Sequence, residues 1–106
     1  MQMTASEVRA VLVRARQGDS EAFRLLVERH SRTAFRLAFR ITGNEQDAED
    51  VVQDSFIKAY RQLGGFQTRA NFGTWLYRIV ANCAVDMIRG RQSRRTHALG
   101  EPFEHA

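Results

Sequence analysis

Polar and charged side chains that suit molecular recognition gather in the second half of the chain. Asp50, Gln53, Asp54 and Ile57 recur at intervals of three and four residues or nearly so, which places them on one side of a helix. An apolar side chain within an acidic patch is what a protein-binding surface uses as its anchor. This pattern predicts a docking surface for another protein. The alternative is a solvated helix face without a partner.

A short polar loop follows this helix. Phe66 and Phe72 enclose four side chains that carry hydrogen-bonding groups: Gln67, Thr68, Arg69 and Asn71. An aromatic ring can stack on an unpaired base, an amide can read the edge of the base and an arginine can bind phosphate. The loop is therefore a candidate site for single-stranded nucleic acid. The alternative places both phenylalanines in the core and leaves the loop as a connector.

The helix after the loop carries a third group of such residues. Arg78, Asn82 and Arg89 share one of its faces, and further arginines crowd its end at positions 91, 94 and 95. Asparagine and arginine can form paired hydrogen bonds with base edges, and clustered arginines neutralise phosphates. This face is a second candidate for nucleic-acid contact. The alternative is a solvated helix end.

Local signals divide the chain into four helices. Residues that cap helix starts stand at Thr4, at Asp19 or Ser20, at Asn44 and at Asn71, and glycines follow the first three helices at positions 18, 43 and 64–65. There is no strand alternation and no internal repeat, and the sole proline, Pro102, lies in the tail. We expect an all-α, compact four-helix domain with short loops over residues 1–96. Residues 97–106 are expected to form a frayed tail or the start of a linker.

The apolar stripes predict which side chains are buried. In the helix that starts after Asn44, the buried stripe is Ala48, Val52, Ser55, Phe56, Ala59 and Leu63, while Asp47 falls with the acidic residues on another face. In the last helix, the core stripe is Phe72, Trp75, Leu76, Ile79, Val80, Cys83 and Met87. Cys83 has two interpretations, a redox sensor and an inert thiol, and its place in the core stripe favours the inert thiol.

Composition narrows the class of protein. The 106 residues suit one domain, and the net charge of +4 fits an anionic partner. Fifteen of the sixteen basic residues are arginine, the better planar donor for phosphate and carboxylate. The charges are segregated, because residues 44–63 hold five carboxylates against two cations, whereas residues 64–97 hold six arginines against one carboxylate. One piece of chain thus presents opposite charges in two places.

The sequence argues against an enzyme, a metal-binding protein and a membrane-inserted protein. The three histidines are far apart, and serine, cysteine and histidine form no nucleophile motif, so we expect no catalytic residue, metal or cofactor. The apolar runs are too short to span a bilayer, and no membrane insertion is expected. A lone cysteine cannot form an internal disulfide, which suits the cytoplasm.

Three stretches, in order, resemble region 2 of bacterial RNA polymerase sigma factors of the extracytoplasmic-function (ECF) group. They are GDSEAFRLLVERH at 18–30, DAEDVVQDSFIKAYRQL at 47–63 and FQTRANFGTWLYRIVANCAVDMIR at 66–89. Each piece alone is a weak signal, but the ordered set is specific. Housekeeping sigma factors carry a tryptophan pair where this chain has Trp75 and Leu76. The leucine resembles the ECF group and implies less wedge-driven melting and a stricter promoter.

The resemblance implies two binding surfaces. Contacts with core RNA polymerase, through the paired helices of the β′ clamp, fall on Asp50, Gln53 and Asp54, with Ile57 and Tyr60 as apolar neighbours. Contacts with the non-template strand of the promoter −10 element fall on the loop from Gln67 to Asn71, on Phe72, and on Arg78, Asn82 and Arg89. A base would be flipped into a pocket between that loop and the helix near Asn82. An anti-sigma factor that covers these surfaces is a further implied partner.

The resemblance also sets the alternatives. Sigma factors normally continue into a second helical domain that reads the −35 element, and nothing in these 106 residues matches it. An excised fragment and a natural single-domain variant both fit this pattern. The rival functions are a protein-interaction module or decoy, which binds an anti-sigma factor or polymerase without reading DNA, and a generic single-strand binder without base preference.

Overall fold

The computed structural model describes residues 3–67 and 70–98, and these form four α-helices. They are α1 (Ala5–Arg16), α2 (Ser20–Thr42), α3 (Glu45–Gln62) and α4 (Phe72–Ala98), with a 3-10 turn, η1 (Leu63–Gly65), directly after α3. No strand occurs among the described residues. The all-α, four-helix prediction is confirmed.

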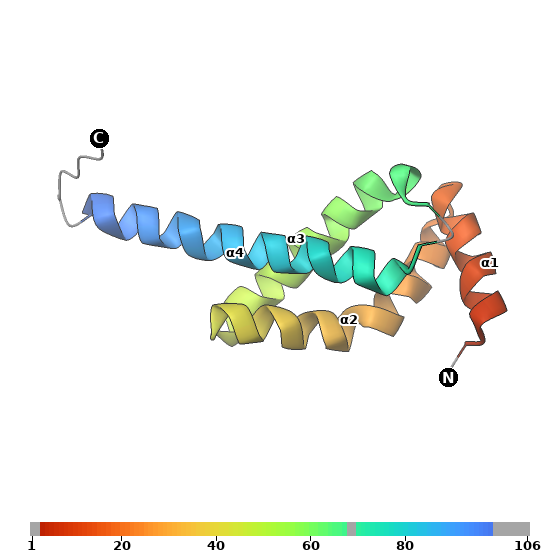
Figure 1. Ribbon diagram of the computed structural model, residues 1–106, viewed down its shortest axis with the longest axis horizontal. Helices are drawn as coiled ribbons and strands as arrows, with labels where there is room; N and C mark the ends of the chain where they lie inside the picture. The colour runs from red at the N-terminus through yellow and green to blue at the C-terminus, as the bar shows by residue number, and fades with distance from the viewer. Residues whose placement is uncertain (1–2, 68–69, 99–106) are drawn as a thin grey trace.

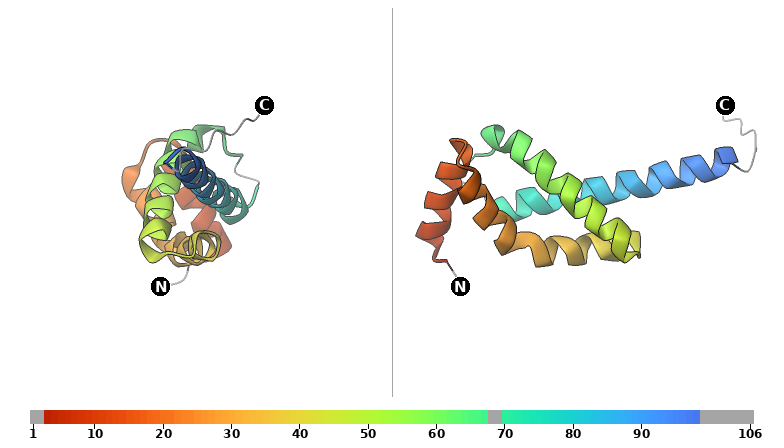
Figure 2. Two further views of the ribbon diagram at one scale, coloured as in Figure 1. Left: turned by 90° about the vertical axis from the view of Figure 1, so that its left-hand side faces the viewer. Right: turned by 180° about the vertical axis from the view of Figure 1, so that it is seen from behind.

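Three helices form a bundle, and the fourth lies across one end of it. α2, α3 and α4 pack on one another, and α1 lies across the end where α2 begins and α4 starts (Figures 1 and 2). α4 has 27 residues and is therefore ~40 Å long. Its second half runs past the ends of α2 and α3, so the arginine-rich segment of the helix projects from the bundle (Figure 1).

The helix boundaries follow the local signals. Thr4 and Glu7 form a reciprocal capping box on α1, and Asp19 accepts the Ala22 N–H at the start of α2. α2 ends at Gly43, whose φ of 71° is the left-handed conformation that favours glycine. α4 continues to Ala98, slightly beyond the predicted start of the tail at 97; residues 99–106 lie outside the described part.

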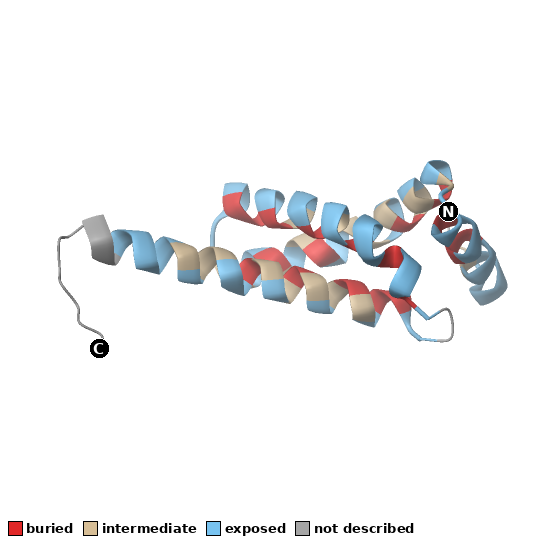
Figure 3. Ribbon diagram, turned by 90° about the horizontal axis from the view of Figure 1, so that it is seen from above, coloured by how far each residue is buried: buried red, intermediate tan, exposed pale blue. Residues whose placement is uncertain are grey.

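Small residues fill the centre of the bundle. Six alanines are fully buried: Ala22, Ala34, Ala38, Ala48, Ala59 and Ala84. Small side chains at helix contacts let the backbones approach closely. Leu26, Val51, Leu76 and Val80 fill the remaining space, and the buried Ser55 hydroxyl donates to the Val51 carbonyl at 2.6 Å, so its polar group is satisfied. Figure 3 shows this burial along the inner faces, while the far end of α4 is exposed.

The buried stripe of α3 is shifted from the predicted one. Val51 is buried, whereas Val52 and Phe56 are only half-buried. The reason is that α3 packs against α2 and α4 at once, so its buried arc includes a position that a single stripe omits. In α4, Ala84 is fully buried, while Trp75 and Cys83 are half-buried at the edge of the core.

Candidate functional site

An acidic surface runs along the exposed side of α3. We define the acidic α3 surface as Asp50, Gln53, Asp54, Ile57 and Tyr60, all of which are exposed. Ile57 is 52% exposed and Tyr60 is 45% exposed, so this surface presents apolar side chains as well as carboxylates to solvent. The Tyr60 ring packs edge-on against Phe23 of α2 at 4.9 Å between centroids, so the ring is held in place while its outer part faces solvent.

Asp47 does not belong to this surface, and its predicted placement there was wrong. Asp47 is 7% exposed, and its carboxylate accepts two hydrogen bonds from the Arg91 guanidinium of α4. The bond from Arg91 Nη2 to Asp47 Oδ1 is 2.8 Å long. Asp47 also does not complete a capping box, because the Asn44 N–H donates to Thr42 Oγ1 instead. Asn44 itself caps α3 by accepting the Asp47 N–H at 2.9 Å.

The Asp47–Arg91 pair ties the first turn of α3 to the second half of α4. The two residues are 44 positions apart, and the two-pronged contact restricts orientation as well as distance. The hydrogen bonds from Arg91 lower the pKa of Asp47, which outweighs the raising effect of burial. The pair therefore orients α4 where it leaves the bundle, ahead of Arg94 and Arg95.

Replacing Asp47 with asparagine should lower the stability of the protein at neutral pH. Because the folded-state pKa of Asp47 is lowered, its contribution is fully present above the ordinary value of 3.8 and disappears as the pH falls through the folded-state value. We expect a thermal midpoint several degrees below that of the wild type at pH 7. The difference in midpoint should shrink as the pH falls from about 4 through the lowered pKa of Asp47. Asp50→Asn is the control, because Asp50 is an exposed acid on the same helix. This substitution should leave the thermal midpoint unchanged both at pH 7 and at low pH. An equal effect of the two substitutions would contradict this role.

Asn82 and Arg89 lie in a groove between α3 and α4. We call it the α3–α4 groove; it has a volume of about 420 Å³ and is lined by Lys58, Gln62, Ile79, Asn82, Val85, Asp86 and Arg89. The groove combines two exposed amides, two cations and the exposed carboxylate of Asp86 with the apolar side chains of Ile79 and Val85. Arg78 is exposed on α4 but does not line this groove. The arrangement can hold a base through Asn82 and an adjacent phosphate through Lys58 or Arg89.

The loop residues divide between solvent, core and helix cap. Gln67 is exposed, and Thr68 and Arg69 lie outside the described residues. Asn71 Oδ1 caps α4 by accepting the Thr74 N–H at 3.0 Å. Phe66 is 2% and Phe72 is 6% exposed, as in the alternative that placed both in the core. They pack edge-on at 5.6 Å, so Phe72 presents little of its ring to solvent.

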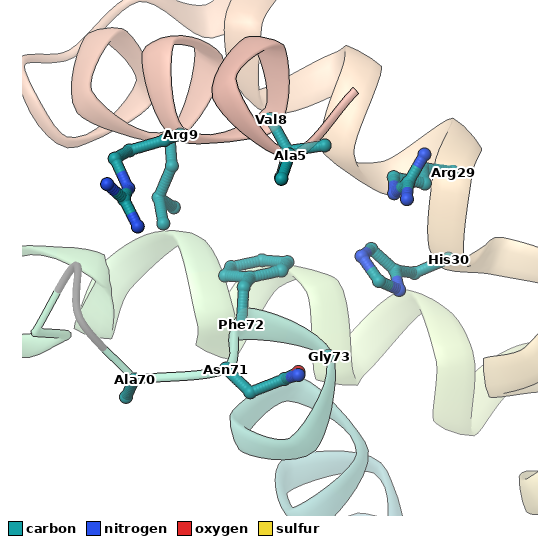
Figure 4. Close-up of a pocket in the computed structure, with 10 residues that line it drawn as sticks. Ala5, Val8, Arg9, Arg29, His30, Ala70, Asn71, Phe72 and Gly73 are labelled. Atoms are coloured by element: carbon teal, nitrogen blue, oxygen red, sulfur yellow. The ribbon is translucent and has the colours of Figure 1, made fainter. Parts of the chain in front are cut away.

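A second hollow lies on another side of α4. The α1–α2–α4 cleft has a volume of about 460 Å³ and takes its walls from Ala5, Val8, Arg9 and Leu12 of α1, from Arg29 and His30 of α2, and from residues 70–73 (Figure 4). His30 Nδ1 is hydrogen-bonded to the Tyr77 hydroxyl at 2.7 Å. Burial lowers the pKa of His30, and the Arg29 charge adds to that effect. The resemblance implied one pocket at the loop and Asn82, whereas Asn71 and Asn82 line two different hollows.

The described residues were also compared with the requirements of a membrane-spanning helix and of a metal site. No helix there is long and apolar enough to cross a membrane. Within residues 3–67 and 70–98, no group of three histidine, cysteine or acidic side chains is arranged to hold a metal ion.

Comparison with protein families and curated proteins identifies relatives. The family model for sigma-70 region 2 matches residues 26–94. The RNA polymerase sigma-H factor of Pseudomonas aeruginosa is 38% identical over 104 residues, which cover 96% of this chain and 54% of that protein. The ECF RNA polymerase sigma-E factor of Haemophilus influenzae is 41% identical over 98 residues, or 91% of this chain and 51% of that protein. The chain thus spans about half the length of these two relatives.

Solved structures agree with this assignment. An engineered region 2 of sigmaE, in complex with GTAAAA, has a TM-score of 0.79 and 39% identity, covering 88% of this chain and 94% of that one. CnrH, in complex with the cytosolic domain of CnrY, has a TM-score of 0.69 and 32% identity over 90% of this chain and 66% of that one. Region 2 is a transcription-regulatory domain and not a known enzyme family. The chain therefore belongs to the sigma-70 region 2 family, as region 2 of a bacterial sigma factor of the ECF group.

Proposed function

We propose that this domain binds core RNA polymerase through the acidic α3 surface and recognises the non-template strand of the promoter −10 element through α4 and the preceding loop. The observation that carries the proposal is the similarity, over nearly the whole chain, to a region 2 domain solved with the oligonucleotide GTAAAA. The physical support is that one helix pair presents an acidic, partly apolar surface on α3 and exposed cations with an amide on α4.

The acidic α3 surface suits a basic helical partner. Asp50 and Asp54 are exposed, and neither is paired with a cation in the described part of the chain. Ile57 and Tyr60 add an apolar anchor beside them. Charged contacts of this kind set the register of binding and speed association. We assign the β′ clamp helices of core polymerase as the partner of this surface.

The α3–α4 groove suits an extruded base. Asn82 can pair with a base edge, and Arg89, Lys58 and the nearby Arg78 can bind the flanking phosphates. Unstacking a base costs a few kcal/mol, which contacts in the groove and neutralised phosphates must offset. Gln67, Thr68 and Arg69 complete the recognition loop, Asn71 anchors it through the α4 cap, and Phe72 supports it from the core.

An anti-sigma factor is the third proposed partner. CnrH is solved with the cytosolic domain of CnrY, and the similarity to CnrH covers 90% of this chain. Such a regulator would cover the acidic α3 surface and keep the domain from polymerase in the cytoplasm. Purification of the tagged protein from its native cells should recover polymerase and a small regulator. Recovery of polymerase alone would count against regulation of this kind.

Replacing Asn82 with alanine should flatten the base preference of the domain. Loss of one bidentate base contact is worth about 1–3 kcal/mol of discrimination, or roughly a 5- to 150-fold loss of preference. The measurement is fluorescence anisotropy of a labelled −10 non-template oligonucleotide and of single-base variants, with and without core polymerase. Arg40→Ala, an exposed residue of α2 outside the groove, is the control and should keep the preference. If Asn82→Ala binds all sequences as wild type does, Asn82 does not read the base.

A further inference from the structure

We propose that Arg16 is a positioning residue for promoter recognition, which acts through the backbone at the end of α3 and not by touching DNA. Its guanidinium Nη2 donates a hydrogen bond to the Gly64 carbonyl oxygen of η1 at 3.1 Å. Gln67, three residues after Gly64, is exposed at the start of the loop that leads to α4. This role rests on the proposed function, because it is a role in reading the −10 strand.

The contact joins two parts of the chain that are far apart in sequence. Arg16 is the last residue of α1, and Gly64 lies 48 residues later. Among residues 3–67 and 70–98, this is the only hydrogen bond that joins α1 to a residue beyond α2. α1 also packs against η1, and Leu12, Ala15 and Leu63 are buried (Figures 1 and 2). Arg16 therefore holds η1 from a helix whose own position is fixed by the core.

The electrostatics of the helix end favour this contact. The last carbonyl groups of a helix lack intrahelical partners and carry a partial negative charge, which a nearby cation stabilises. Because η1 follows α3 directly, the Gly64 carbonyl lies at this negative end. Arg14 pairs with Asp19, whereas Arg16 forms no ion pair in the described part of the chain. The Arg16 guanidinium is thus available to the carbonyl.

The glycine pair in η1 explains why this segment needs an anchor. Neither Gly64 nor Gly65 has the left-handed φ that Gly18 and Gly43 adopt. A Cβ added at either position of the pair would meet no atom within 4 Å. The fold therefore does not require glycine here, whereas glycine adds backbone freedom. Such freedom would spread the positions of the following loop and raise the entropy cost of binding a strand.

Two anchors restrict this freedom. Arg16 binds the backbone at the start of the glycine pair. After the pair, Phe66 is 2% exposed and packs against the rings of Phe72 and Trp75, at centroid distances of 5.6 and 5.0 Å. Without Arg16, the aromatic anchor would remain, but the two glycines before it would move more freely.

The test replaces Arg16 with methionine, a long, unbranched residue of comparable helix propensity that has no donor and no charge. Amide hydrogen exchange in the free protein is measured at Phe66, whose N–H donates to the Leu63 carbonyl at 3.0 Å. Exchange there should be about two- to fivefold faster than in wild type. Anisotropy with the −10 oligonucleotide and its single-base variants should show a loss of base preference of about the same size. The thermal midpoint should stay within about 2 °C of wild type, because the contact is exposed.

Gly65→Ala is the rescuing change. In the Arg16→Met background it removes backbone freedom at a position that accepts a Cβ. It should restore about half or more of the lost base preference and slow exchange at Phe66. Arg40→Met is the matched control. It removes an exposed arginine of α2 at the opposite end of α3 from η1, and should change both quantities by less than about 1.5-fold.

Three outcomes would overturn the proposal. Unchanged exchange at Phe66 in Arg16→Met would show that Arg16 does not hold the turn. Unchanged base preference would do the same for its part in recognition, and a salt dependence weaker by about one phosphate would then identify a direct contact with the DNA backbone. Failure of Gly65→Ala to restore either quantity would exclude backbone freedom as the cause. If exchange responds as expected but wild type has no base preference, the proposed function is refuted, while the role of Arg16 in holding the turn stands.

Discussion

Replacing Asp54 with arginine should abolish the assistance that core polymerase gives to promoter binding. Asp54 lies in the middle of the acidic α3 surface, exposed and without an ion-pair partner among the described residues. A cation there would face the basic partner that the surface is proposed to bind, and like charges opposed at an interface cost several kcal/mol. We expect core affinity to fall by roughly 100-fold or more. Anisotropy of the labelled −10 oligonucleotide, titrated with core, measures the change.

Glu45→Arg is the control for this experiment. Glu45 is an exposed acid on the opposite side of the same helix from Asp54. Reversing the charge at Glu45 should therefore leave core affinity nearly unchanged. Oligonucleotide binding without core should be the same for wild type and Asp54→Arg, because the two surfaces are separate. If core strengthens binding of Asp54→Arg as much as of wild type, the polymerase contact lies elsewhere. If core has no effect even on wild type, the domain is a decoy or a general single-strand binder.

Replacing Leu76 with alanine should cause a large loss of stability, greater than the loss expected for Asp47→Asn. Leu76 is 0% exposed and is among the largest fully buried side chains. Truncating a buried leucine removes its transfer free energy and leaves a cavity, which together cost about 2–5 kcal/mol. The neighbouring buried alanines have no side-chain atoms that could move into the space. Urea denaturation followed by helical circular dichroism measures the free energy of unfolding.

Val85→Ala is the matched control for the core substitution. Val85 lies on the same helix and is 38% exposed, so its truncation should change the free energy of unfolding by less than about 0.5 kcal/mol. A loss of less than about 1 kcal/mol for Leu76→Ala would show that α4 is not held by the core that the structure describes. Because α4 also carries Asn82 and Arg89, partial unfolding of Leu76→Ala should weaken oligonucleotide binding in proportion to the unfolded fraction.

The helices, the exposed surfaces and the family could be predicted from the order of the residues. Helix starts and stops depend on groups within three or four residues, such as Thr4 with Glu7 or Gly43 at the end of α2, and these interactions form whatever the rest of the chain does. The exposure of Asp50, Asp54 and Asn82 also follows from periodicity, because each lies away from the apolar stripe of its own helix. The ordered motifs pointed to region 2 of an ECF sigma factor, and the matching family model and relatives confirm it.

Contacts between residues that are distant in the chain could not be predicted in this way, because they depend on tertiary packing. Periodicity within α3 predicts that Asp47 is exposed. Its burial depends on Arg91, which lies 44 residues later, in the second half of α4, and donates hydrogen bonds to it. His30 meets Tyr77 and Phe72 because α2 and α4 pack together, and the cleft beside them exists because α1 closes that end of the bundle. Periodicity gives the direction of a side chain from its own helix, whereas contacts depend on how the helices are placed relative to one another. That placement is set by the small buried residues at all the helix contacts together, which no single stretch of sequence encodes.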